Sequence, residues 1–471
     1  MPELSPAAGQ TTLDLESLAA EVVAQAMKAG ASDAEAVVRE GDEFSVNVRM
    51  GEVETLKESG SRGLGLRVFL GSSAVAGTRS ASTSTSDLTP DGIRQLVEGA
   101  MALAKVTEED PFAGLPETAD FGSVSDDLHL YYDDVYSLAG PERIEWARRC
   151  EAAALAADPR ITNSDGGSFD AATGRKVLAN SRGFVGGYRT SYAGVSAAPL
   201  AMDSNGQMQR DGWWSGARRL ADLDSPEAVG SEAARRALRR LGARKVPTQR
   251  VPIVFAPEVA RSLIGSVFEA ASGDSIWRHA SFLAGKLGVA IAAPSITIVD
   301  DNLMLLPAGA GGFGSSPFDG EGLPSRRTVV VQNGTLQTYL LNTYAARKLG
   351  LKSTHNASRG LAGTPGIGCG NLYLEPGALT PEEIIAGVPG GLYVTSLMGF
   401  GTNLVTGDYS RGATGLMIEN GQLTHAVEEV TIAGNLAEML MNVSAIGNDL
   451  VFRGSVASPT LRIDGMTIAG A

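Results

Sequence analysis

The stretch "FSVNVRMGEVETLKESGSRGLGLRVFLG", residues 44–71, alternates apolar and polar side chains. A period of two is typical of a strand with one buried face. Residues 51–52 and 71–72 suit the two-residue turns of hairpins. The stretch therefore predicts an antiparallel meander whose strands are residues 44–50, 53–59, 64–70 and 73–79.

Helices are predicted before and after this meander. Apolar residues recur at helical spacing in residues 12–29, 87–106, 140–158 and 226–241. Residues 160–216 alternate short strand-like runs with Gly, Asn and Ser turns. The first half of the chain therefore mixes helices with strands.

The second half has a different pattern. A short apolar strand at residues 251–257 leads directly into a helix that runs to residue 274. Residues 333–334 and 420–421 are both Asn-Gly between strand-like runs, and Asn-Gly supplies the positive φ values of a type I′ turn. Residues 435–450 predict one more helix near the end of the chain.

The fold class that follows is α+β. A chain of 471 residues is long enough for two domains. We predict a mixed α/β N-terminal domain over residues 1–245, followed by a β-rich C-terminal domain over residues 246–471. The boundary falls where the fourth predicted helix gives way to the proline-containing run KVPTQRVP.

Composition limits the classes of partner. A net charge of −14 repels nucleic acid and anionic membranes. One basic run, ARRALRRLGARK at residues 234–245, is either a solvated helix face or a docking surface for an acidic partner. The N-terminus lacks the pattern of a secretory signal, and no apolar run approaches 18 residues. We therefore expect a cytoplasmic protein without a membrane span.

Two local motifs resemble sites of chemistry. GAGGFG, residues 309–314, has the letters GxGxxG, but a dinucleotide loop must open a helix and none is predicted after it. Cys369 lies among glycines, with His355 a short distance before it. This pair serves either as nucleophile and base or, as base rates favour, as ordinary packing residues.

Metal ligands at diagnostic spacing are missing from the sequence. The four histidines are far apart, and none has a partner at i+3 or i+4. Glu269, Asp274 and His279 would converge only if the helix ended or bent between the two carboxylates, because five residues place side chains about 140° apart. The simpler interpretation is a helix end with solvated carboxylates.

An ordered series of segments resembles the TldD/PmbA family. The resemblance is densest between residues 250 and 453, and it is carried by VPIVFAP, the helix ending in ASGD, GFGSSPFDGEGLPSRRTVVVQNGTLQTYLLNTYAARKLG and SLMGFGTNLVTGDYSRGATGLMIENG. This family, once described as modulators of DNA gyrase, is understood as a two-subunit metalloprotease. The resemblance implies a cytoplasmic protease of unfolded or flexible peptides.

The helix ending in ASGD distinguishes the two branches of that family. The TldD branch carries HExxxH there, with two zinc-binding histidines and a glutamate general base, and adds a cysteine ligand near the C-terminus. This sequence has Ile264, Gly265 and Glu269 at the three positions, and residues 451–465 contain no cysteine. The chain thus resembles the PmbA branch, also called TldE, and we expect no catalytic residue, cofactor or metal in it.

The resemblance also implies partners. A TldD-like catalytic subunit would hold the zinc. This chain would form part of the wall of the peptide chamber, help to select substrates and stabilise the complex. A homodimer is expected when that partner is absent. The glycine-rich loop from Gly309 to Gly322 is a candidate for contact with peptide substrate, although an ordinary connection explains it as well.

Two alternatives remain at this point. One is a self-sufficient peptidase or other hydrolase that uses Glu269, Asp274, His279 or Cys369. The other is a gyrase- or nucleic-acid-associated binding protein that acts through Arg235–Arg250, which the acidic net charge disfavours.

Overall fold

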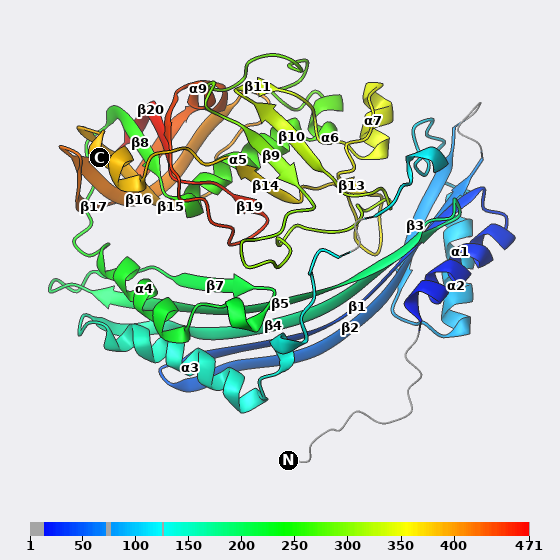
Figure 1. Ribbon diagram of the computed structural model, residues 1–471, viewed down its shortest axis with the longest axis horizontal. Helices are drawn as coiled ribbons and strands as arrows, with labels where there is room; N and C mark the ends of the chain where they lie inside the picture. Colours follow the sequence, from blue (N-terminus) through cyan, green and yellow to red (C-terminus); the bar gives the residue numbers. More distant parts are fainter. Residues whose placement is uncertain (1–13, 72–76, 125–126, 471) are drawn as a thin grey trace.

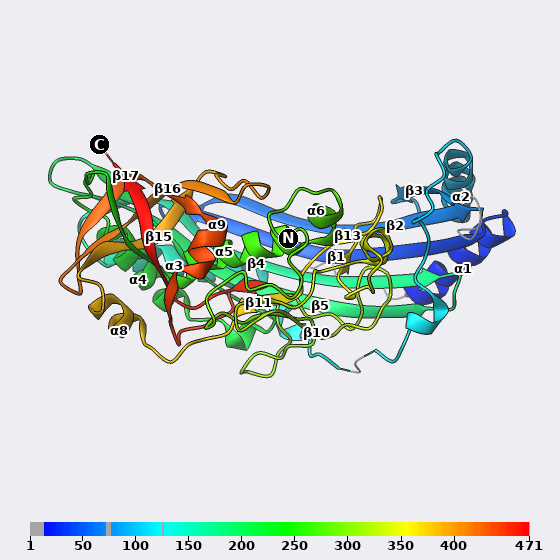
Figure 2. The ribbon, with the colours of Figure 1, turned by 90° about the horizontal axis from the view of Figure 1, so that it is seen from above.

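The computed structural model describes residues 14–71, 77–124 and 127–470, and it confirms the α+β fold class. A long, curved antiparallel sheet from the first half of the chain lies along one side of the molecule, and the second half sits on its concave face (Figure 1). The view from above shows the same superposition (Figure 2). The long sheet contains β1 (Asp33–Arg49), β2 (Glu52–Leu70), β3 (Arg79–Thr85), β4 (Ile161–Asn180), β5 (Val185–Met202), β6 (Met208–Arg210) and β7 (Trp213–Ala217).

The strands of the long sheet are paired in the order β3-β2-β1-β4-β5-β6, and β7 also pairs with β5. The predicted meander is confirmed in part. Its first turn is Met50-Gly51, not residues 51–52, because Arg49 pairs with Glu52 and both turn residues have positive φ. The predicted strands 53–59 and 64–70 are one continuous strand, β2. Residues 73–76 of the predicted strand 73–79 lie outside the described part of the chain, and β3 starts at Arg79.

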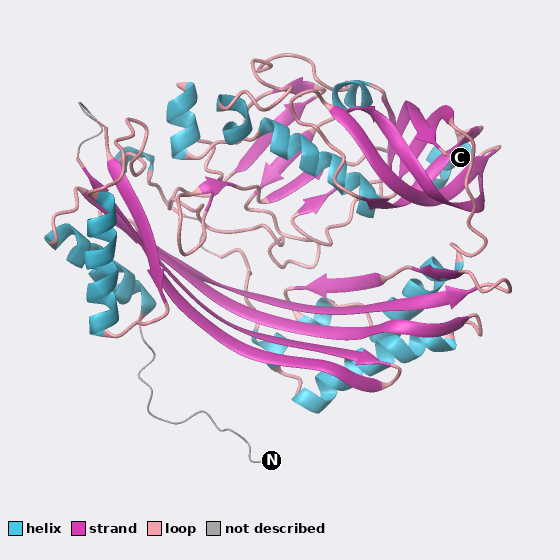
Figure 3. Cartoon of the chain, turned by 180° about the vertical axis from the view of Figure 1, so that it is seen from behind, coloured by secondary structure: helices cyan, strands magenta, loops and turns pink. Residues whose placement is uncertain are grey.

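The two faces of the long sheet are covered by different elements (Figure 3). Ala34, Ala36 and Val38 of β1 pack with the helices near one end of the sheet. Val37, which points the other way, packs with Phe318 of the second half of the chain. The helices of the first half are α1 (Leu15–Lys28), α2 (Pro90–Ala104), α3 (Gly140–Ala156) and α4 (Pro226–Leu238), with short 3₁₀ turns at Thr118–Asp120, Asp133–Tyr136 and Leu220–Asp222.

The second half is built around two further sheets and one packed helix. The pairings β17-β16-β15-β8-β20 are closed by β17 with β20, so these strands wrap around the core. The strands of this sheet are β8 (Gln249–Phe255), β15 (Gly390–Met398), β16 (Asp408–Glu419), β17 (Gln422–Asn435), β18 (Val443–Ile446) and β20 (Leu461–Ala469). The neighbouring sheet contains β9 (Ile298–Asp301), β10 (Arg327–Gln332), β11 (Thr335–Leu336), β14 (Asn371–Leu374) and β19 (Val456–Ala457), and β12 (Ala357–Ser358) pairs with β13 (Gly366–Ile367).

Helices of the second half are short apart from the first. They are α5 (Pro257–Ala271), α6 (Gly273–Trp277), α7 (Thr343–Leu349), α8 (Pro381–Ala386) and α9 (Leu436–Met441). The two Asn-Gly hairpins are confirmed, since Asn333, Gly334, Asn420 and Gly421 all have positive φ. In the described part of the chain, every helix is too short or too polar to cross a membrane.

Two predicted segments differ from the structure. Residues 160–216 contain two long strands, β4 and β5, rather than a series of short ones, because their glycines continue the ladder instead of turning it. The helix predicted for residues 435–450 ends at Met441, and residues 443–446 pair with β20 as β18. The long sheet uses residues before 245 and the other sheets use residues after it. The exact domain boundary remains a prediction.

Candidate functional site

The three helix positions that could have held a catalytic site lie on α5 and point in different directions. Ile264 is 1% exposed and belongs to the hydrophobic core. A side chain added at Gly265 would meet nothing within 4 Å. Glu269 is exposed to solvent. Because a zinc site needs several donors aimed at one point, this set does not fit zinc.

A metal site of Glu269, Asp274 and His279 required the helix to end between the two carboxylates. The helix does end there, because Ser272 is extended between α5 and α6, but the three side chains do not form a site. Asp274 instead accepts a hydrogen bond of 3.1 Å from Trp277 Nε1, and His279 is exposed. Among the residues that the structure describes, no group of three or more His, Cys, Asp or Glu side chains comes together in a metal-binding arrangement.

Cys369 and His355 do not form a nucleophile–base pair. His355 Nδ1 lies 2.7 Å from the carbonyl oxygen of Pro324, and no hydrogen bond joins the two side chains. Burial raises the pKa of the Cys369 thiol to about 12. A thiol in this state is almost wholly protonated at neutral pH, so it is a poor nucleophile.

Several arginines of the basic stretch are engaged in contacts within the chain. Arg235 makes a two-bond ion pair of 2.7 Å with Glu232. Arg240 donates to the carbonyl oxygen of Arg210, and Arg250 donates to that of Gly465. These guanidinium groups are therefore distributed over several contacts.

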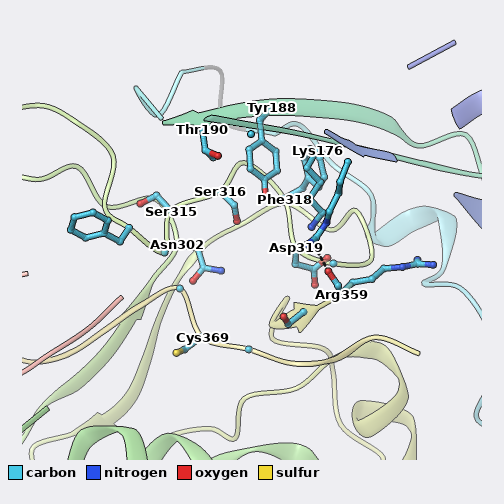
Figure 4. A pocket seen from close by; sticks show the side chains of 18 of the residues that line it. Lys176, Tyr188, Thr190, Asn302, Ser315, Ser316, Phe318, Asp319, Arg359 and Cys369 are labelled. Carbon is cyan, nitrogen blue, oxygen red and sulfur yellow. Dashed lines mark hydrogen bonds between the residues drawn. The ribbon is translucent and has the colours of Figure 1, made fainter. Parts of the chain in front are cut away.

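A cavity of about 510 Å³ lies between the long sheet and the loops of the second half. Figure 4 shows side chains from both halves converging on it. The candidate loop from Gly309 to Gly322 contributes residues 313–316 and 318–320 to its wall. Labelled side chains at the cavity are Lys176, Tyr188 and Thr190 from the sheet and Asn302, Ser315, Ser316, Phe318, Asp319, Arg359 and Cys369 from the loops.

Among the ionisable groups that line this cavity, Lys176 and Asp319 have pKa values shifted toward neutral pH. Burial lowers the pKa of Lys176 to about 8, and the positive charge of Arg39 acts in the same direction. Burial raises the pKa of Asp319 to about 7, and the charge of Glu321 raises it further. Backbone N–H groups of residues 321, 323 and 357 donate to Asp319 and limit that rise. Groups of this kind mark a candidate functional site.

Sequence reasoning missed Lys176 and Asp319 because they lie on different halves of the chain. Only the glycine-rich loop gave a local signal for one of them. The cavity wall is fixed by a buried ion cluster in which Glu35 lies 3.2 Å from Arg67 and 2.7 Å from Arg359. Arg39 also contacts the carbonyl oxygen of Arg359. The loops of the second half are therefore held firmly against the sheet.

The cavity is better equipped for binding than for nucleophilic chemistry. The hydroxyl group of Ser316, which lines it, lies 3.3 Å from that of Ser325. Lys176 makes no hydrogen bond to a hydroxyl or thiol of the described residues, so it does not hold one of these groups as an activated nucleophile. The cavity instead offers cationic groups, a carboxyl group and hydroxyl groups. These can form hydrogen bonds and ion pairs with the amides and charged side chains of a bound peptide.

Comparison with known proteins gives a consistent family. Models of the PmbA/TldA metallopeptidase match domain 1 to residues 34–104, the central domain to residues 133–241 and the C-terminal domain to residues 248–470. Metalloprotease PmbA of Escherichia coli O157:H7 is 38% identical over 453 residues, which cover 96% of each chain.

Two proteins of Haemophilus influenzae allow the similarity to each branch to be compared. The metalloprotease PmbA homologue is 34% identical and covers 99% of this chain and 100% of its own. The metalloprotease TldD homologue is 25% identical and covers 87% of each chain. Within this one bacterium, the chain is therefore more similar in sequence to the PmbA homologue than to the TldD homologue.

Solved structures share the whole architecture. A protein of Bacteroides thetaiotaomicron, described as a candidate modulator of DNA gyrase, has a TM-score of 0.88 at 27% identity and covers 98% of this chain and 100% of its own. TldE of Thermococcus kodakarensis has a TM-score of 0.84 at 21% identity, covering 96% and 100%, and this likeness concerns the fold alone.

Proposed function

The chain belongs to the PmbA/TldD metallopeptidase family, and on that premise we propose that it is the non-catalytic subunit of a two-subunit metalloprotease. The observation that carries the proposal is the face of α5. Ile264 is part of the core, Gly265 has no side chain, and Glu269 points to solvent. The greater similarity to a PmbA homologue than to a TldD homologue supports the same branch.

The zinc of such a protease would be held by a TldD-like partner subunit. A zinc ion bound there would polarise the scissile carbonyl and activate a water molecule. No donor set in the described part of this chain fits that ion. The present chain contributes binding groups and structure, and it forms a homodimer when the partner is absent.

Unfolded or flexible peptides are the proposed substrates, and the cavity between sheet and loops is the place where this chain meets them. Lys176 and Arg39 can pair with acidic groups, and Asp319 accepts or donates a proton near neutral pH. Phe318 and Tyr188 supply apolar surface beside these groups. We place the complex in the cytoplasm.

The proposal is tested by separating the two subunits. The purified chain alone is expected to hold well under one zinc per chain by elemental analysis and to leave a flexible fluorogenic peptide uncut. Adding a TldD-like subunit is expected to yield a stable complex that cleaves the peptide. About one tightly held zinc together with cleavage by the isolated chain would overturn the proposal.

One second candidate rests on a specific observation, the pair of shifted groups in the cavity. Lys176 and Asp319 would serve as base and acid if this chain were a self-sufficient hydrolase. Peptidase activity of the isolated chain that is lost in Lys176→Met and kept in Glu269→Gln would favour this candidate. Peptidase activity found only in the complex, and none in the isolated chain, would exclude it.

A further inference from the structure

A second cavity, of about 290 Å³, lies where α4 and β7 meet the start of α5 and the segment from residue 449 to residue 458. Figure 1 shows these elements facing one another at the end of the long sheet that carries α4. We call it the arginine–tryptophan pocket, after six of the residues that line it: Trp213, Trp214, Arg236, Arg239, Arg261 and Arg453. It is separate from the cavity that contains Lys176 and Asp319.

Most guanidinium groups of this pocket already have partners. Arg235, which also lines it, is held by Glu232. Arg261 donates to the carbonyl oxygen of Glu258 at 3.1 Å, and Arg453 donates to that of Trp214 at 3.0 Å. These contacts fix the rim of the pocket and leave two arginines to account for.

Arg236 is 6% exposed, yet its bonding is incomplete. Its guanidinium lies 3.6 Å from Asp211 and 3.7 Å from Glu258, which are long ion pairs, and its Nε makes no hydrogen bond. A buried donor without a partner is destabilising unless something else supplies an acceptor. An acceptor in the pocket would complete this group.

Arg239 lacks more hydrogen-bond partners than Arg236. Its Nε and Nη2 are buried without hydrogen-bond partners, and no carboxylate of the described residues lies within ion-pair distance. Five arginines at the pocket face three lining carboxylates, those of Glu232, Glu258 and Asp449, and Asp211 is a fourth behind Arg236. The surplus is one positive charge, which matches the charge of one carboxylate.

The aromatic rings keep these groups in place. Arg236 and Arg453 lie 4.6 and 4.3 Å from the ring centre of Trp213, and Arg261 lies 5.7 Å from that of Trp214. Guanidinium groups stacked on rings lose little further freedom on binding an anion. The planar fork of arginine also matches both oxygens of a carboxylate.

We propose that the arginine–tryptophan pocket binds a carboxylate group carried by a peptide, either its C-terminus or an Asp or Glu side chain, with Arg239 and Arg236 as the anchoring residues. The peptide as carrier rests on the proposed function, whereas the preference for a carboxylate rests on the pocket itself. Arg261 lies one turn before Gly265 on α5. A bound peptide would therefore lie near the open side of the helix that carries no catalytic groups.

Binding is measured by isothermal titration calorimetry on the full chain without partner or zinc. Three acetylated peptides are compared: Ala-Ala-Ala-Leu with a free C-terminus, the same peptide as C-terminal amide, and Ala-Asp-Ala-Leu amide. At least one of the two carboxylate peptides is expected to bind ten times or more tightly than the neutral amide, and which of them does so identifies the source of the carboxylate.

Variants locate the site. Arg239→Gln is expected to lower the affinity for the carboxylate peptide at least tenfold. Arg240→Gln, one residue further along the chain and outside the pocket, is expected to leave that affinity unchanged. Arg453→Gln is the second pocket variant if near-ultraviolet circular dichroism shows that Arg239→Gln does not fold. Equal binding of acid and amide, no binding at about 5 mM peptide, or wild-type affinity in a folded pocket variant would overturn the inference. Failure of the proposed function would appear separately, as peptidase activity of the isolated chain.

Discussion

At the scale of single residues, Ile264 and Gly265 show that adjacent positions of α5 are under opposite constraints. Ile264 lies in the core, where a polar imidazole would lose its water without gaining a partner. Gly265 faces open space, where a larger side chain adds helix propensity without a clash. Restoring the zinc motif on this helix is therefore harder at the first position than at the second.

We expect Ile264→His to lower the free energy of unfolding by about 2–4 kcal/mol. Gly265→Glu, the matched control on the same helix, is expected to be neutral or to raise it by up to about 1 kcal/mol, because glycine inside a helix is unfavourable. Urea denaturation followed by circular dichroism measures both. A destabilised Gly265→Glu variant would mean that this side of α5 is covered in the folded protein.

The two cysteines allow a second residue-scale prediction. Burial raises the pKa of Cys150 and of Cys369 to about 12, so only about one thiol in ten thousand is ionised at pH 8. We expect iodoacetamide at pH 8 to leave both thiols of the native chain unmodified within an hour, as measured by intact mass. The unfolded chain in urea is the control and should gain two modifications. Rapid labelling of the native chain at Cys369 would indicate that this thiol is reactive and could act as a nucleophile.

At the scale of elements, the ion cluster of Glu35, Arg67 and Arg359 joins β1, β2 and the loop after β12. Glu35 and Arg359 side chains are both 1% exposed, and that of Arg67 is 7% exposed. One carboxylate is therefore shared by two buried guanidinium groups. Removing it leaves two buried guanidinium groups without their ion-pair partner, and this penalty exceeds the value of an ordinary salt bridge.

We expect Glu35→Gln to lower the free energy of unfolding by about 3–5 kcal/mol. Glu40→Gln is the matched control on the same strand, because the pair of Glu40 with Arg62 is much more exposed, and its loss should change stability by less than about 1 kcal/mol. Chemical denaturation of the two variants provides the comparison. Equal effects would show that the cluster is hydrated in solution.

Turns and strand lengths differ in how far the sequence determines them. The Asn333-Gly334 turn is predictable because its backbone conformation depends on its own two residues. The unbroken course of β2 is not, since its glycines signal turns locally while the structure uses them for close packing. A side chain at Gly65 would strike the backbone of Leu361, which crosses the sheet at that point. Such a requirement is invisible until the two halves are brought together.

At the scale of the whole molecule, the same contact between halves creates the cavity with Lys176 and Asp319. The glycine-rich loop was predictable as a candidate because its composition is local. Its partner residues on β4 and β5 were not, because no pattern in either strand indicates which loop will cover it. The candidate site is thus a property of the docked halves, and its titration reports on that docking.

Asp319 makes the stability of this arrangement depend on pH. Its pKa is raised from 3.8 to about 7 in the folded chain, mainly because burial disfavours the charged form. Between pH 4 and pH 7 the folded state therefore binds more protons than the unfolded state, so the contribution of this group to stability falls as pH rises. Below pH 4 both states are protonated, and above pH 7 the full penalty is present.

We expect the wild-type chain to lose about 3 kcal/mol more stability than Asp319→Asn between pH 4 and pH 8, as an order of magnitude. The measured quantity is the slope of unfolding free energy against pH, not its level, because the Asp319→Asn substitution also disturbs the hydrogen bond from the N–H of Ala357. Asp91→Asn, at an exposed carboxyl group of α2, is the control and should keep the wild-type slope. Parallel slopes for wild type and Asp319→Asn would mean that water reaches Asp319 in solution, and the cavity would then be open between the sheet and the loops.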